Sequence, residues 1–455
     1  EGDDDRHAMD VARRSSSTSL NLTDRVPRAS EVGASVSARS AVDPALKKIT
    51  NGRRRRALLE PLEAEFGWSR ATTSGAVTAN LVLYGLTAPF AAALMERFGL
   101  RRVMTLALLL ISVGAGLTLV MTAAWQLWLL WGLCVGIGTG SMALVLGSVV
   151  ANRWFATRRG LVTGVFSAAS STGQLIFLPA IAALATGPGW RYAAILTAVA
   201  SLLLVPVVIV VIRDWPADVG LAPYGADEVG AEGEQAALAA TSGPQRSAGD
   251  VARGAVTVLV EAARTRAFWV LAGTFFVCGW STNGLVGTHF IPAAHDHGMP
   301  HTTAANLLAF IGILDIIGTI ASGWLTDRVD PRLLLCAYYL LRGLSLLVVP
   351  SVLGPDVQPN LLLFVIFYGL DWVATVPPTM ALCRMHFGLE RSSIVFGWVF
   401  ASHMVGAGIA ATYAGWIRQT YGDYEAAWLT AGGLCVLAAA ACITIRRQVR
   451  AVHTA

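Results

Sequence analysis

The chain has 455 residues, of which 55% are hydrophobic and 14% are charged. Soluble proteins contain roughly 25% charged residues, so this composition excludes an ordinary soluble enzyme. The net charge is +5, but the basic residues are scattered between long apolar runs rather than gathered into a patch, which argues against a nucleic-acid partner. The chain is therefore predicted to be an all-α protein that crosses a lipid bilayer several times.

The apolar runs begin after a polar segment, residues 1–58, which we interpret as a disordered or non-native tail. A helix needs about 20 apolar residues to cross a bilayer core about 30 Å thick. Eleven runs meet this requirement, at 72–95, 103–122, 125–150, 160–184, 190–212, 267–292, 303–325, 333–353, 360–384, 392–417 and 425–445. Five of them precede a polar segment and six follow it. The predicted domains are a tail (1–58), a first bundle (59–212), a linker (213–266), a second bundle (267–447) and a short C-terminal tail (448–455).

Arginine is frequent in every second connection between the spans. By the positive-inside rule these connections, the linker and the C-terminus face the cytoplasm, here of a bacterial inner membrane. The same rule would place the basic residues 47–56 outside, because the span at 72–95 ends inside. We therefore expect a first helix to be missing before Pro61, through a wrong start or a shifted reading frame. With that helix each half would have six spans, twelve in all.

Two cytoplasmic connections resemble each other, AALMERFGLRR at 92–102 and GWLTDRVDPR at 323–332. Each places an acid before an arginine at the same end of a span. This pattern resembles the major facilitator superfamily signature GxxxDRxGRR, which implies two pseudo-symmetric helical bundles and a latch between them at the cytoplasmic side. The predicted latch residues are Glu96, Arg97, Arg101, Arg102, Asp327, Arg328 and Arg332. A simple positive-inside anchor would explain the arginines but not the recurring acid.

Further stretches narrow the resemblance. WFATRRGLVTGVFSAAS at 154–170 is similar to the helix-five signature of monocarboxylate porters. Segments 213–225, 369–379 and 396–408 also resemble bacterial members of that group, including oxalate:formate-antiporter-like proteins. The resemblance implies a secondary transporter rather than an enzyme, monomeric and without cofactor or metal, that moves a small organic acid with protons by alternating access. Two alternatives stay open, proton-antiport efflux of drug-like compounds and a non-transporting remnant that lacks helix one.

Four ionisable residues lie near the middle of their spans, where a charge is costly without a partner: Asp315, Arg342, Asp371 and His403. Asp315 and Asp371 are candidates for proton coupling or for permanent salt bridges. Arg342 suits a substrate carboxylate, but its helix is expected to be peripheral, which favours a structural pair with either acid. His403 is a proton relay or, more commonly for a lone histidine, a neutral hydrogen-bonding group. Monocarboxylate porters have an arginine one turn after the first of these acids, where this chain has Thr319.

Uncharged polar residues also fall on helices that the resemblance places around a central cavity. The candidates are Asn80, Tyr84, Gln174 and Asn283. Each is a possible substrate contact, although interhelical hydrogen bonds are the more frequent role of such residues. An outer turn contains His295, Asp296, His297 and His301, for which a polar turn is favoured over a metal site.

Overall fold

The computed structural model describes residue 62 and residues 65–184, 188–229 and 248–445. Ten helices in these residues are long and apolar enough to cross a membrane, and each coincides with a predicted span. The remaining predicted span, 160–184, coincides with the 26-residue helix α9 (Arg159–Leu184). The predicted tail at 1–58 and the position of the missing helix lie outside the described residues.

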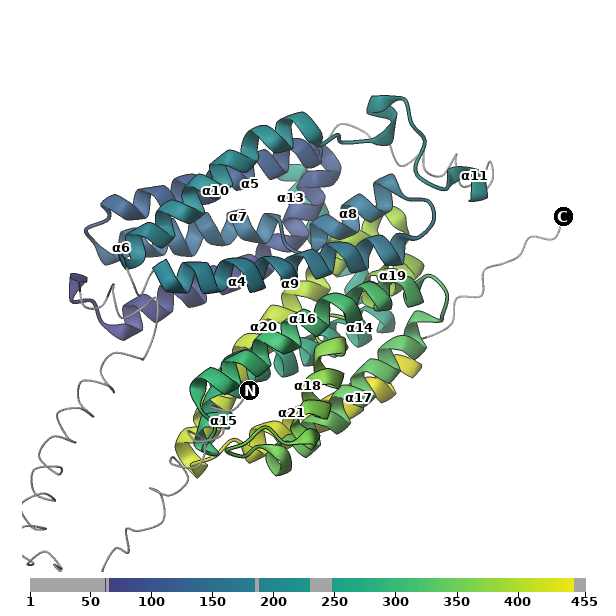
Figure 1. The fold of residues 1–455 in the computed structure, drawn as a ribbon. Coiled ribbons are helices and arrows are strands. Elements are labelled where there is room, and N and C mark those ends of the chain that lie inside the picture. The colour runs from purple at the N-terminus through teal and green to yellow at the C-terminus, as the bar shows by residue number, and fades with distance from the viewer. Residues whose placement is uncertain (1–61, 63–64, 185–187, 230–247, 446–455) are drawn as a thin grey trace, which may run out of the picture. The chain divides into compact units, whose positions relative to one another are not determined.

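The helices that precede the linker gather in one group, purple to teal in Figure 1. They are α4 (Arg70–Phe98), α5 (Leu100–Leu117), α6 (Ala124–Leu127), η2 (Trp128–Val135), α7 (Gly136–Ser141), α8 (Val145–Trp154), α9 and α10 (Trp190–Val211). In this first group α5 packs against α10 and α7, and α4 packs against α7.

The helices that follow the linker form a second group, green to yellow in Figure 1. They are α14 (Arg266–Gly279), η5 (Trp280–Val286), α15 (Gly287–Asp296), α16 (His301–Thr326), α17 (Pro331–Val352), α18 (Pro359–Asp371), α19 (Val376–Phe387), α20 (Leu389–Tyr421) and α21 (Glu425–Ile443). Here α17 packs against α21, and α14 packs against α20.

The two groups meet mainly along two helix pairs, α9 with α16 and α4 with α20, and α9 also contacts α19 and α8 also contacts α20. Glycines make the approach close: a Cβ on Gly160 would lie 2.6 Å from the carbonyl oxygen of Gly323, and one on Gly164 would lie 2.7 Å from that of Thr319. Small residues let helix backbones approach in a membrane, where lipid offers little hydrophobic drive for association. The α9–α16 contact therefore depends on residues that have no side chain to separate the helices.

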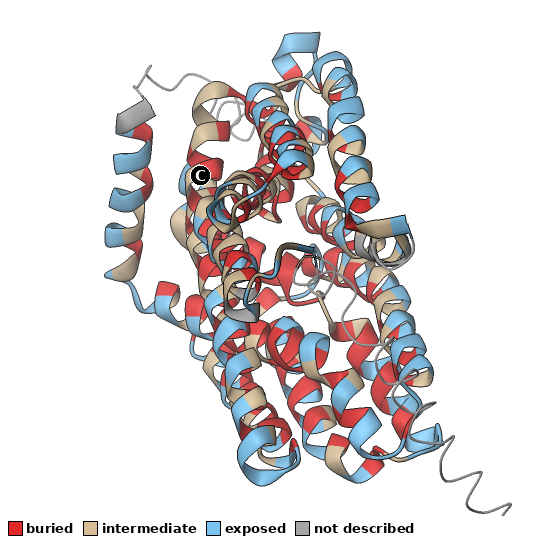
Figure 2. Ribbon diagram, turned by 90° about the vertical axis from the view of Figure 1, so that its left-hand side faces the viewer, coloured by how far each residue is buried: buried red, intermediate tan, exposed pale blue. Residues whose placement is uncertain are grey.

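Burial follows the pattern expected of helices surrounded by lipid. Figure 2 shows exposed residues along the outer helix faces and buried ones toward the interior. On α10, Leu203 and Val210 are 65% and 67% exposed although both are strongly apolar. Such exposure would be costly in water over a long helix but is favourable against acyl chains.

The linker contains structure that its polar composition did not predict. Helix α13 (Ala248–Ala263) packs against both α4 and α20. The indole Nε1 of Trp398 donates to the carbonyl of Ala255 (3.0 Å), and Arg391 forms an ion pair with Glu261. The linker helix thus joins a helix of each group.

Candidate functional site

A cavity of about 480 Å³ lies between the two groups. Tyr84 and Ser171 line it from the first group, and Asp315, Asn283 and His403 line it from the second. Its other walls are mainly apolar. A mostly apolar cavity with a few convergent polar groups is the usual form of a small-molecule site.

Asp315 is the cavity residue with the most demanding environment, since it is 1% exposed in the middle of α16. Its Oδ1 accepts hydrogen bonds from Thr319 Oγ1 and from the backbone N–H of Val373, both at 2.8 Å. Its Oδ2 accepts a hydrogen bond from Ser171 Oγ of α9. Within the described residues Asp315 forms no ion pair. Three hydrogen bonds contact this carboxylate, and one of them reaches across from the first helix group.

The bond from Val373 exists because the helix between α18 and α19 is interrupted at residues 372–375. Pro377 and Pro378 have no N–H, so the carbonyls of Val373 and Ala374 lose their helical donors. Ser322 Oγ donates to the Ala374 carbonyl instead (2.6 Å). In lipid, such a break is tolerated where side chains satisfy the freed backbone groups.

The same break binds Arg342. Its Nε donates to Asp371 Oδ2 at 2.6 Å, and its Nη2 donates to the backbone carbonyls of Asp371 and Trp372. Its Nη1 donates to Cys278 Sγ (3.2 Å) and Ser281 Oγ (3.5 Å). These contacts occupy all five N–H groups of a guanidinium that is 1% exposed. Neither Arg342 nor Asp371 lines the cavity, and the structure pairs them with each other.

His403 lines the cavity from α20. Its ring stacks on Phe400 at 5.8 Å and approaches Phe275 at 4.9 Å. The residue is only 8% exposed. Its Nδ1 is buried and has no hydrogen-bond partner among the described residues. An unsatisfied nitrogen beside a cavity is available to a water, a proton or a ligand.

The uncharged candidates divide into two kinds. Tyr84 and Asn283 line the cavity, and the Tyr84 ring meets Phe400 edge-on at 5.6 Å. Asn80 instead donates through Nδ2 to the carbonyl of Trp131 (2.8 Å) and is not among the cavity-lining residues. Gln174 lies in α9, and its side chain is outside what the structure describes.

The basic end, which we define as the end of the helices with Arg97, Arg101, Arg102, Arg158, Arg159, Arg328 and Arg332, holds a second polar site. Asp327 follows α16 and accepts hydrogen bonds from the N–H groups of Gly160 (2.7 Å) and Leu161 (2.9 Å) in the first turn of α9. These N–H groups have no helical partner, and the positive end of the helix dipole favours an anion there. The carboxylate of the second group thus caps a helix of the first.

The equivalent acid of the first repeat makes a different contact. Glu96 pairs with Arg153 of its own group (3.1 Å), and Arg153 also donates to the Met95 carbonyl (2.7 Å). The repeated acids therefore occupy related positions with different partners.

The start of α20 is bound by Asn152 of the first group, which donates to Ser392 (2.9 Å) and Ser393 (3.1 Å).

The predicted latch arginines make contacts within their own neighbourhood. The Arg101 N–H donates to Asp214 Oδ1 (2.9 Å), and Arg332 pairs with Asp330 (2.6 Å). The remaining members do not share one type of partner: Arg97 lies over Phe98, Arg328 over Trp324, and Arg102 is exposed. Asp327 is a predicted latch residue whose hydrogen bonds reach the other group.

Contacts between the groups concentrate between the cavity and the basic end. Besides Asp327, the hydroxyls of Ser148 and Ser393 lie 3.3 Å apart, both almost fully buried. In the other direction the cavity continues to Ile291 and Ala305, near the opposite ends of their spans. The structure is therefore closed at the basic end of the cavity.

Sequence reasoning missed several of these residues. Ser171 belongs to a row of polar residues at 167, 170, 171 and 174, whose spacing of three and four places them on one helix face, and this row was the available signal. The proline pair at 377–378 was a second signal, because it predicts an interrupted helix. For Arg153 and Ser393 no comparable signal exists.

The outer histidine turn is occupied by local contacts. Asp296 forms an ion pair with Arg418 (2.6 Å), and the His295 and His301 rings stack at 3.8 Å. His297 Nδ1 lies 2.8 Å from the carbonyl of Ala293.

Comparison with known proteins gives one consistent result. The family model described as Major Facilitator Superfamily matches residues 56–383 and 290–454. An uncharacterized MFS-type transporter of Bacillus subtilis is 25% identical over 360 residues, 78% of this chain and 81% of the relative. Monocarboxylate transporter 12-B of Danio rerio is 27% identical over 364 residues, 76% of this chain and 73% of the relative. The Escherichia coli fucose:proton symporter has a similar fold, with a TM-score of 0.58 and 17% identity over 83% of this chain and 93% of its own.

Proposed function

The chain belongs to the major facilitator superfamily, and from this premise we propose that it moves a small organic acid together with protons by alternating access. The bundles 59–212 and 267–447 are the units that rock about the cavity. The observation that carries the proposal is Asp315, a carboxylate at the cavity wall that is 1% exposed and has no ion pair among the described residues.

Asp315 is suited to couple protonation to movement. Hydrogen bonds to an ionised carboxylate are roughly twice as strong as those between neutral groups. The bond from Ser171 is therefore strongest when Asp315 is ionised and weakens when Asp315 takes up a proton. This bond crosses between the bundles. Protonation therefore loosens a contact that holds α9 against α16.

An organic acid as substrate is supported by the relatives named monocarboxylate transporters and by the helix-five motif. Arg342 is saturated, so the substrate carboxylate must be bound by other groups. The cavity offers the unpartnered Nδ1 of His403 and the neutral donors Asn283, Thr282 and Ser170. Tyr84 adds an aromatic wall.

The basic end is placed in the cytoplasm by the positive-inside rule. Since the bundles touch there and the cavity extends toward Ile291 and Ala305, the conformation is outward-facing. The cycle then requires separation of the contacts made by Asp327, Ser148 and Ser393.

The proposal is tested with the purified protein in proteoliposomes. An inward proton gradient is expected to drive accumulation of labelled lactate or pyruvate above the equilibrium level. A protonophore should remove the accumulation but not facilitated exchange. If folded protein gives no uptake of either acid above empty liposomes, the organic-acid proposal is wrong.

We expect Asp315→Asn to abolish proton-driven accumulation while exchange of labelled for unlabelled substrate continues. Asparagine keeps the size of the side chain and can accept a hydrogen bond, but it cannot bind and release a proton. Accumulation should fall from several-fold to the equilibrium level, measured beside counterflow in the same preparation. Asp356→Asn, which removes an exposed acid outside the spans, is the control and should behave like wild type. Unchanged accumulation by Asp315→Asn would exclude Asp315 as the coupling group.

Asp327→Asn should slow the transport cycle on the order of tenfold, with little change in the substrate half-saturation constant. The substitution removes charge-assisted bonds to two N–H groups, each worth about 1.5 to 3 kcal/mol, and so disfavours closure of the basic end. Turnover and half-saturation are measured by initial-rate uptake. Asp330→Asn is the matched control, because Asp330 pairs with Arg332 of its own bundle. Wild-type turnover in Asp327→Asn would contradict a latch.

A second candidate function, proton-antiport efflux of a drug-like cation, is favoured by the charge of the cavity. Its described lining contains the acid Asp315 but no arginine or lysine. Transport assays separate the two candidates. A lipophilic cation is transported in exchange for protons if the second is right, whereas lactate is taken up together with protons if the first is right.

A further inference from the structure

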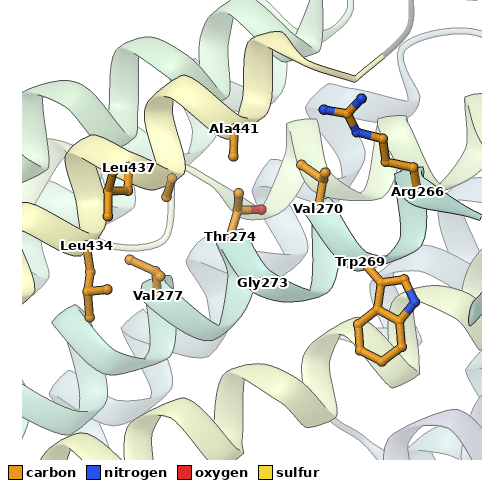
Figure 3. Close-up of a pocket in the computed structure, with 10 residues that line it drawn as sticks. Arg266, Trp269, Val270, Gly273, Thr274, Val277, Leu434, Leu437 and Ala441 are labelled. Atoms are coloured by element: carbon orange, nitrogen blue, oxygen red, sulfur yellow. The ribbon is translucent and has the colours of Figure 1, made fainter.

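A second cavity, of about 360 Å³, lies on the outer surface between α14 and α21, away from the transport cavity. Figure 3 shows it as a groove, with Arg266 and Ala441 at one end and Val277 and Leu434 at the other. Gly273 lines the groove and is exposed. A Cβ on Gly273 would meet nothing within 4 Å, so the space beside it is open.

The groove has a charged mouth and an apolar interior. Arg266 stands at the basic end, is exposed, and forms no ion pair among the described residues. Trp269, 62% exposed, lies one turn further along and donates its indole N–H to the Ala263 carbonyl. Beyond it the walls are aliphatic apart from Thr274, and Leu437 is 67% exposed. Tryptophan and arginine at a span end, followed by aliphatic side chains, mark the change from lipid headgroup to acyl chain.

The length of the groove agrees with one leaflet. From Arg266 to Val277 there are 11 steps along α14, which correspond to about 16 Å at about 1.5 Å per residue. Half of a bilayer core of about 30 Å is about 15 Å. A chain that enters at Arg266 and ends beside Val277 therefore reaches the bilayer midplane.

We propose that this groove binds an anionic phospholipid from the leaflet at the basic end, with its phosphate on Arg266 and one acyl chain along Val270, Gly273 and Val277. The guanidinium presents paired N–H donors that match two phosphate oxygens, and it has no competing acid among the described residues. The aliphatic walls favour a phospholipid over free phosphate, because phosphate has no acyl chain to contact them. The proposal depends on the membrane fold and not on the identity of the transported substrate.

A bound lipid would act on the transport helix. Helix α14 continues into η5, whose Thr282 and Asn283 line the transport cavity. A lipid held between α14 and α21 thus contacts the helix that leads into the transport cavity.

The test uses the full chain in nanodiscs that contain equal phosphatidylcholine and phosphatidylglycerol, with retained lipids identified by native mass spectrometry. Wild type is expected to retain phosphatidylglycerol preferentially. Arg266→Gln should weaken this retention about fivefold, the effect of one basic residue at a membrane surface. Arg264→Gln removes the same charge two residues earlier, outside the groove, and should retain the lipid like wild type. Gly273→Leu places a side chain in the open space of the groove, and the variant protein should no longer retain a lipid of either headgroup.

The following outcomes would contradict the lipid proposal. Equal retention of the two lipids by wild type, or equal losses in Arg266→Gln and Arg264→Gln, would show that the headgroup is not recognised at Arg266. Full retention by Gly273→Leu, with a melting temperature like that of wild type, would show that the acyl chain does not lie in the groove. Glycerol phosphate added alone should not displace the lipid, and displacement would assign the site to the soluble anion.

Discussion

Replacing Ser148 and Ser393 by cysteine is expected to give a transporter that stops when a disulfide forms and resumes when the disulfide is reduced. The two hydroxyl oxygens lie 3.3 Å apart on α8 and α20, which is close enough for sulfur atoms to bond with small adjustments. Because the proposed cycle requires the basic end to open, a covalent link there should hold that end closed. Uptake of labelled lactate should fall at least tenfold after oxidation, to the level of empty liposomes.

The single variants Ser148→Cys and Ser393→Cys control for the loss of each hydroxyl and for the six native cysteines, which are free in the structure. A protease site inserted at residues 230–247 allows the link to be detected, since the halves then separate on a gel only when they are not joined. Transport by the cross-linked protein at the wild-type rate would show that α8 and α20 do not part during the cycle.

The membrane spans could be predicted from the sequence because a bilayer leaves the backbone so few options. A segment that crosses lipid must pair its backbone groups internally, so apolar length alone identifies it. The ends could not be predicted in the same way. The run at 267–292 belongs to a span that continues to Asp296, because helical hydrogen bonding persists after the side chains become polar.

The depth of the ionisable residues could also be predicted, but not their partners. A helix that is apolar on most faces has a weak amphipathic signal, so its rotation is decided by packing. For this reason Asn80 was expected near the cavity but bonds to Trp131. The interruption at 372–375, which supplies bonds to both Asp315 and Arg342, is a local backbone feature that depth along a span does not reveal.

The repeated acid shows the limit of arguments from duplication. Glu96 and Asp327 have the same place in their repeats, yet Glu96 lies beside Arg153 and Asp327 beside the exposed N–H groups of α9. Position is inherited through the repeat, whereas the partner depends on neighbouring residues that have since diverged. Arg153 is 6% exposed and needs a counter-charge, which Glu96 supplies within its own bundle.

The buried pair of Arg342 and Asp371 leads to the second large effect. Arg342→Gln should lower the stability of the protein by about 3 to 5 kcal/mol, because removing one partner of a buried ion pair leaves the other uncompensated. Asp371 already has one oxygen, Oδ1, without a hydrogen-bond partner among the described residues, and the carbonyls of Asp371 and Trp372 would lose the hydrogen bonds from the guanidinium. Expression and the melting temperature in detergent measure the loss.

The double variant Arg342→Gln with Asp371→Asn separates a structural pair from a substrate site. If the two residues act on each other, the double variant should be less destabilised than the sum of the singles, because no buried charge is left unpaired. Ser345→Ala, on the same helix, is a suitable control, since the Ser345 hydroxyl donates to the Arg342 carbonyl of its own helix. A stable Arg342→Gln protein whose single defect is a raised half-saturation constant would instead mean that the guanidinium leaves Asp371 and binds the substrate. The saturation of all five N–H groups argues against that outcome, since every new contact to a substrate would have to replace an existing bond to Asp371, Trp372, Cys278 or Ser281.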